Sequence, residues 1–139
     1  MRRLTAISMS AHLSHLIEGG QIGGAASDFV IVEWTDAGEP GIEWIAPLHL
    51  HRSADEAWYV LEGTMRFQIG AETFEASRGD AVLAPKGTPH TFGNAQTRRL
   101  ARYLLVTTPR IHALIEALHA PGAGDPAAVY AAHDSELLR

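Results

Sequence analysis

The chain has 139 residues and a mass of 15.0 kDa, with 46% apolar residues, 19% charged residues and a net charge of −5. This composition predicts one globular domain over residues 1–139, and the scattered basic residues form no stripe that would bind nucleic acid. The absence of cysteine excludes disulfides, thiolate metal ligands and a cysteine nucleophile.

The first 28 residues have no clear pattern and fit either a short strand or a frayed helix that ends at Gly19-Gly20. Serine and histidine interrupt any hydrophobic segment here, which argues against a secretory signal. No run in the chain approaches the roughly 20 apolar residues that cross a bilayer. We therefore expect a cytoplasmic protein that does not bind membranes.

Residues 29–108 are predicted to form the core of an all-β domain. Short apolar runs alternate with Gly, Pro, Asp or Asn; they are DFVIVEW, GIEWIAPLHLH, EAWYVLEG, TMRFQIG, ETFEAS, GDAVLAP, HTFGN and RYLLVTT. Runs of strand length at this spacing are typical of an antiparallel sandwich or barrel. In TMRFQIG, apolar and polar residues alternate, which predicts a strand with one buried face.

One helix is predicted over residues 109–120. Thr108 can cap it, Pro109 suits its first position, and Pro121-Gly122 ends it. Apolar residues at helical spacing predict that one side packs on the barrel or on a second subunit. The remaining residues, 121–139, are rich in Ala, Gly and Pro, and we expect a mobile end or an arm that reaches a partner.

Two histidines, His49 and His51, are one residue apart in a predicted strand. Residues i and i+2 of a strand point to the same face, so both imidazoles could reach one metal ion. On its own this pair also fits two histidines on a solvated sheet face. A polar turn follows, and Glu56 then precedes the apolar run AWYVL, where a carboxylate needs a partner. Asp55 is the competing carboxylate, although it fits the turn better.

His90 follows a Pro- and Gly-containing turn and begins the run HTFGN. The whole pattern resembles the two signature motifs of the cupin superfamily. The first motif reads Gly41-(x7)-His49-x-His51-(x4)-Glu56-(x6)-Gly63, and the second reads Gly79-(x5)-Pro85-x-Gly87-(x2)-His90-(x3)-Asn94. Only the first glycine is displaced, by two residues, from the usual spacing. The chain is similar to small single-domain bacterial cupins of the quercetin-dioxygenase-like type.

The resemblance implies a double-stranded β-helix, or jelly-roll barrel, followed by a C-terminal α-helix. It also implies that His49, His51, Glu56 and His90 bind a divalent transition metal (Fe, Mn, Ni, Co, Cu or Zn), because no ligand position is substituted. Ligand type alone does not choose among these metals. Glu56 would double as a proton acceptor in catalysis.

The pocket beside such a site is expected to be apolar. Its candidate lining residues are Trp58, Met65, Phe67, Phe92 and Tyr103, each of which equally fits the barrel core. The other histidines are interpreted as solvent-facing or helix-surface residues; they are His12, His15, His112, His119 and His133.

Three functions are open from the sequence. The first is a metal-dependent dioxygenase that acts on a small organic compound able to chelate the metal. The second is an oxygen-independent, metal-dependent isomerase, lyase or hydrolase, and the third is a non-catalytic module that binds a metal or small molecule. A small-molecule substrate is the expected partner. Outward residues such as Tyr59 and Leu61 favour a homodimer.

Overall fold

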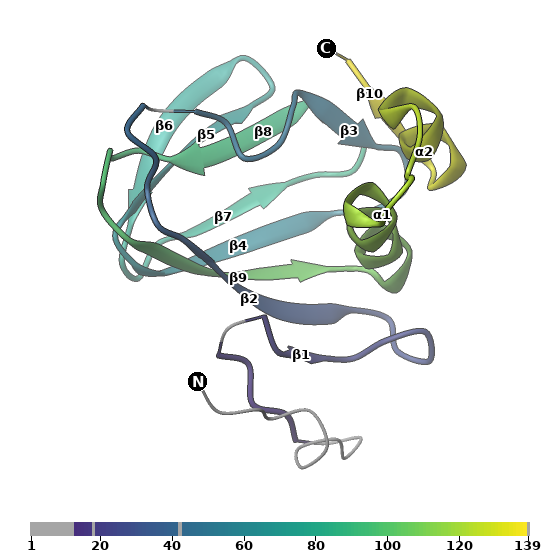
Figure 1. The fold of residues 1–139 in the computed structure, drawn as a ribbon, viewed down its shortest axis with the longest axis horizontal. Helices are drawn as coiled ribbons and strands as arrows, with labels where there is room; N and C mark the ends of the chain where they lie inside the picture. Colours follow the sequence, from purple (N-terminus) through teal and green to yellow (C-terminus); the bar gives the residue numbers. More distant parts are fainter. Residues whose placement is uncertain (1–12, 18, 42, 139) are drawn as a thin grey trace.

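A computed structural model of the protein describes residues 13–17, 19–41 and 43–138, so the predictions for residues 1–12, including His12, lie outside the described part. Two antiparallel sheets face each other across a hydrophobic core (Figure 1). The first sheet has the order β1 (Gln21–Ile22), β2 (Val30–Asp36), β9 (Ala101–Thr107), β4 (Glu56–Glu62) and β7 (Ala81–Ala84). The second has the order β10 (Ser135–Leu137), β3 (His49–His51), β8 (His90–Asn94), β5 (Thr64–Ile69) and β6 (Glu72–Ser77).

The core between the sheets comes from the alternation of apolar residues along the strands. Met65 and Phe67 of β5 are fully buried, and the Trp58 ring of β4 lies 5.3 Å from the Phe67 ring. Alternation turns every second side chain inward, so each strand contributes one face to the core. The predicted all-β jelly roll with a C-terminal helix is therefore confirmed.

The β4–β5 turn depends on Gly63. Its φ of +79° is in the left-handed region, and a Cβ atom there would lie 2.4 Å from the carbonyl oxygen of Leu100. Only glycine combines this backbone conformation with such a close approach. The glycine expected from the motif thus has a local structural reason.

Helix α1 (Pro109–His119) begins where the sequence predicted. The Thr108 hydroxyl accepts a hydrogen bond from the backbone N–H of Ile111 at 3.2 Å, and Pro109 occupies the first turn. Ile111 and Leu114 are buried, so the apolar side of the helix packs on the protein.

The expectation of a mobile end or an extended arm for residues 121–139 was wrong for the described part of that segment. It forms helix α2 (Pro126–Ala132) and strand β10, and β10 pairs antiparallel with β3. In Figure 1, α1 and α2 lie together at one end of the two sheets, next to β3. None of the helices in the described residues is long and apolar enough to cross a lipid bilayer.

Candidate metal centre

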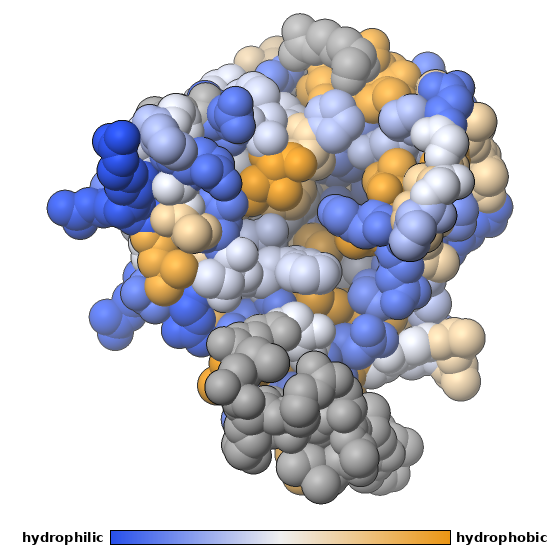
Figure 2. Space-filling model, viewed as in Figure 1, coloured by the Kyte–Doolittle hydropathy of each residue, from blue (hydrophilic) through white to orange (hydrophobic). Residues whose placement is uncertain are grey.

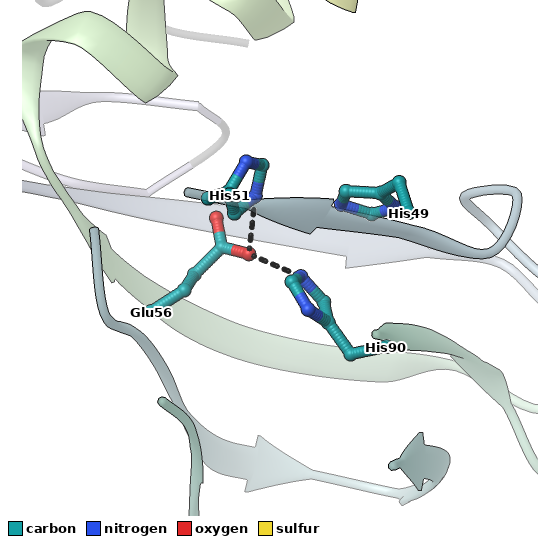
Figure 3. Close-up of side chains that lie close together, drawn as sticks. All are labelled: His49, His51, Glu56 and His90. Carbon is teal, nitrogen blue, oxygen red and sulfur yellow. Dashed lines mark hydrogen bonds and ion pairs between the residues drawn. The ribbon is translucent and has the colours of Figure 1, made fainter. Parts of the chain in front are cut away.

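Four side chains converge at one point between the sheets: His49, His51, Glu56 and His90. All four are buried, and one potential ligand atom from each lies within 4.8 Å of the others. Donor atoms around one ion at about 2.1 Å are at most about 4.2 Å apart, close to the spacing here. Figure 3 shows His51 and His90 directed at the Glu56 carboxylate, with His49 beside them on β3.

Strand pairing explains how residues from distant parts of the sequence meet. His49 and His51 share one face of β3, and His49 is directly opposite His90 on β8. Glu56 begins β4 in the opposite sheet. Because the inner faces of the two sheets oppose each other, the carboxylate meets the three imidazoles from across the core.

Each imidazole is oriented by a hydrogen bond from its Nδ1 atom. His49 donates to the carbonyl of Pro47 at 2.6 Å, and His90 donates to the carbonyl of Thr88 at 2.9 Å. The third, His51, donates to the Ser135 hydroxyl at 2.8 Å; that hydroxyl in turn donates to the His133 carbonyl at 3.0 Å. The Nε2 atoms therefore face the centre as lone pairs, which is the tautomer that metal ligation requires.

The polar atoms at the centre fit a cation. Nε2 of His90 is 3.1 Å and Nε2 of His51 is 3.3 Å from the same oxygen of Glu56. A neutral imidazole has one N–H, and in both rings it is already donated from Nδ1. The two Nε2 atoms and the Glu56 oxygen are therefore all acceptors, with no hydrogen between them. Nε2 of His51 is moreover buried without a hydrogen-bond partner among the described residues. A divalent ion between these atoms would satisfy all of them.

The electrostatics keep the ligands in suitable charge states. Burial would raise the pKa of Glu56, but the adjacent imidazoles of His51 and His90 outweigh burial and lower that pKa to about 2. Burial, helped by the neighbouring His90, lowers the pKa of His49 to about 4. At neutral pH the site therefore offers an ionised carboxylate and a neutral His49 imidazole.

Asp55, the competing carboxylate, is used in the turn. Its Oδ1 atom accepts a hydrogen bond from the backbone N–H of Lys86 at 2.8 Å. The backbone N–H of Gly87 also donates to the carbonyl of His51 at 2.7 Å. These two bonds tie the turn before β8 to the end of β3, and so hold His90 beside His51.

A cavity of about 820 Å³ opens from the four-residue cluster toward α1 and α2. Figure 2 shows this face of the molecule hollowed, with hydrophobic side chains in and around the hollow. His49, His51 and Glu56 line the cavity, and apolar residues of the barrel and of α1 form most of the walls. None of the described residues that line the cavity is lysine or arginine.

The predicted pocket residues divide into two groups. Phe92 and Tyr103 line the cavity. In contrast, Trp58, Met65 and Phe67 lie in the hydrophobic core and do not line it. The Trp58 ring is 5.7 Å from the His90 ring, so it packs against a candidate ligand from the core side.

The interpretation of His112 as a solvent-facing or helix-surface residue was wrong. It is 9% exposed and lines the cavity, and its Nε2 atom donates to the Gln21 side-chain oxygen at 2.9 Å. Gln21 belongs to β1, so the burial of His112 involves a long-range contact that the helical pattern does not reveal. His15 and His119 are exposed and His133 is half-buried.

Sequence reasoning missed two residues beside the centre, both from the C-terminal segment. Ser135, fully buried in β10, is paired with His51 and hydrogen-bonds to it. Tyr130, in α2, lines the cavity, and its ring lies 5.2 Å from the His49 ring. Burial and the nearby Glu56 raise the pKa of Tyr130 to about 12. For Tyr130, the sequence feature that could have indicated a role was a lone aromatic residue in the alanine-rich run AAVYAA. No sequence feature indicated Ser135.

The fold and the ligand cluster agree with a comparison against protein families. Residues 39–107 match the family described as Cupin domain. The chain contains a cupin domain. The match covers β3 to β9, and therefore all four candidate ligands of this cupin, but it ends before α2 and β10.

Three relatives illustrate the range of similar proteins. An uncharacterised protein of Methanocaldococcus jannaschii, MJ1618, is 38% identical over 47 residues, which are 34% of this chain and 38% of that protein. The structure of the polyketide cyclase RemF from Streptomyces resistomycificus has 30% identity and a TM-score of 0.50, covering 61% of this chain and 57% of that one. A cupin-superfamily sugar phosphate isomerase from Silicibacter pomeroyi has 26% identity and a TM-score of 0.52, covering 64% of this chain and 58% of that one. The similarity thus spans less than two thirds of each relative.

Proposed function

We propose that this cupin is a metal-dependent enzyme whose substrate is a small, largely apolar organic compound that binds through oxygen atoms. His49, His51, Glu56 and His90 would hold the metal. The bound ion would polarise substrate oxygen atoms and stabilise negative charge that develops on them.

One observation supports the proposal above all: three of the four clustered candidate ligands line a cavity of about 820 Å³ with mainly apolar walls. Sites for small organic molecules are typically apolar with a few convergent polar groups. The described lining contains acidic residues but no lysine or arginine, so a phosphate group would find neither of the side chains that usually bind it. This disfavours sugar phosphates and favours diketones, enols or phenolic compounds.

The chain's own residues would position the substrate and accept a proton from it. Phe92 and Tyr103 offer aromatic surface beside the ligands. Glu56, ionised at neutral pH, is the candidate proton acceptor, since one of its two oxygen atoms has no imidazole nitrogen bonded to it in the described structure. Transfer of a proton from the carbon next to a polarised carbonyl to the Glu56 carboxylate would convert a ketone to its enolate.

Oxygen-independent isomerisation or cyclisation is our preferred reaction class, because the polyketide cyclase RemF is among the similar structures. A dioxygenase reaction on the same class of compound is the second candidate. The ligand set supports it, since three imidazoles and one carboxylate leave positions on a six-coordinate ion for further ligands.

The test is to incubate metal-loaded protein with a panel of β-diketones, flavonols and polyphenols, with and without oxygen. Product formation without oxygen would support the preferred class, and oxygen uptake matched to substrate loss would support a dioxygenase. The His49→Ala/His51→Ala double variant is the control and should be inactive. Conversion of no compound under either condition would contradict the proposal.

A further inference from the structure

The C-terminal helix α2 holds a tyrosine beside one of the candidate ligands. Tyr130 is 3% exposed and its ring lies 5.2 Å from the His49 ring, at an angle of 57°. It lines the same cavity as His49, His51 and Glu56. The residue lies outside the part of the chain that matches the cupin family, which ends at residue 107.

The position of Tyr130 is fixed by the strand that follows it. β10 pairs with β3 along its whole length, with Ser135 opposite His51 and Leu137 opposite His49. The hydrogen bond from His51 to Ser135 joins the same strands at the ligands themselves. The segment that contains Tyr130 is therefore attached to the strand that presents two of the four ligands.

Among the side-chain hydrogen bonds of the described residues, none involves the Tyr130 hydroxyl, and Tyr130 lines the cavity. A phenol is protonated at neutral pH, so this group is an O–H donor at the cavity surface. A polar group that is largely removed from water is stabilised by a partner, and the cavity is where that partner would lie. An oxygen acceptor held at the adjacent ligand cluster fits this requirement.

We infer that the Tyr130 hydroxyl donates a hydrogen bond to an oxygen atom of the substrate bound at the four-ligand centre. The inference rests on the proposed function and deepens it. The acceptor that gains most from such a bond is an anionic oxygen, such as that of an enolate, a diketonate or a tropolonate. Tyr130 thereby selects compounds that become anionic when they bind, and helix α2 contributes to specificity as well as to the fold.

The test uses the full chain loaded with Co²⁺, and tropolone as a probe that binds through two oxygen atoms. Calorimetric titration compares the wild type with Tyr130→Phe, which removes one hydroxyl and keeps the ring packed on His49. A hydrogen bond to a charged acceptor contributes about 1.5–3 kcal/mol, so tropolone affinity should fall roughly 10- to 100-fold. Tyr59→Phe is the matched control, because Tyr59 lies on β4 with 42% of its surface exposed.

The supporting result is weaker tropolone binding by Tyr130→Phe, with Co²⁺ affinity and thermal midpoint equal to those of the wild type. Equal tropolone affinity, or no tropolone binding by wild-type protein that contains Co²⁺, would overturn the role of Tyr130. A parallel loss of Co²⁺ affinity in Tyr130→Phe would also overturn it, since it would show a structural effect on the ligands. Failure of the wild type to bind Co²⁺ would contradict the proposed function itself.

Discussion

Replacing Ser135 with alanine removes a single buried hydroxyl that orients a candidate metal ligand. The Ser135 oxygen accepts the Nδ1–H of His51 at 2.8 Å, and its own proton is donated to the His133 carbonyl. The serine is 0% exposed, so water has no direct access to replace it. The variant leaves the four candidate ligands chemically unchanged.

The size of the effect follows from the lost hydrogen bond. A buried N–H without a partner costs about 1–3 kcal/mol, and the His51 ring can avoid that cost only by turning or by changing tautomer. Either change removes the Nε2 lone pair from the centre. Loss of such a supporting bond typically lowers metal affinity about 10- to 100-fold, and we expect an effect in this range for Ser135→Ala.

Competition titration with a Zn²⁺ chelator measures the affinity, and nitrogen NMR of metal-free protein reports the tautomer of His51. Ser77→Ala, which changes an exposed serine of β6, is the control and should match the wild type in both. Zn²⁺ affinity of Ser135→Ala within twofold of wild type, with an unchanged His51 tautomer, would show that Ser135 does not orient His51 for metal binding.

Three further predictions concern stability. Trp58→Ala empties a fully buried core position and should lower the free energy of unfolding by about 3–5 kcal/mol in urea titrations, whereas less than 1 kcal/mol would contradict the packing described here. Gly63→Ala should lower the thermal midpoint, because φ is +79° and a Cβ atom would meet the Leu100 carbonyl; Gly122→Ala, also at positive φ but with open space around it, should cost less. Metal-free protein should lose stability as pH falls from about 6.5 to about 4, because the pKa of His49 is lowered from 6.5 to about 4 in the folded state, which therefore disfavours the charged imidazole. This difference in pKa corresponds to up to about 3 kcal/mol of unfolding free energy. A flat profile of unfolding free energy against pH in urea titrations would contradict this prediction.

Only part of the ligand cluster was visible in the local sequence. His49 and His51 lie two residues apart in a strand, so their shared face follows from strand geometry, and Glu56 was notable as a carboxylate before an apolar run. The strand runs and the start of α1 were also visible in apolar spacing and in the Thr108-Pro109 pair. Bringing His90 to the same point required the resemblance, because nothing local indicates that β8 pairs with β3.

The C-terminal segment could not be predicted, because its structure depends on long-range contacts. α2 has seven residues and β10 has three, and both are too short and too rich in small residues to produce a clear pattern. Ser135 is 84 residues from His51 in the sequence. Alternation likewise identified Met65 and Phe67 as inward-facing, but it does not distinguish side chains that meet a cavity from those that fill the core.

The most direct test of the account is elemental analysis of the wild-type protein purified without added metal, beside the His49→Ala/His51→Ala double variant. We expect close to one transition-metal ion per wild-type chain and almost none in the folded double variant. A metal-free wild-type protein that also fails to take up Zn²⁺, Co²⁺, Mn²⁺, Ni²⁺, Cu²⁺ or Fe²⁺ when these are supplied would contradict it.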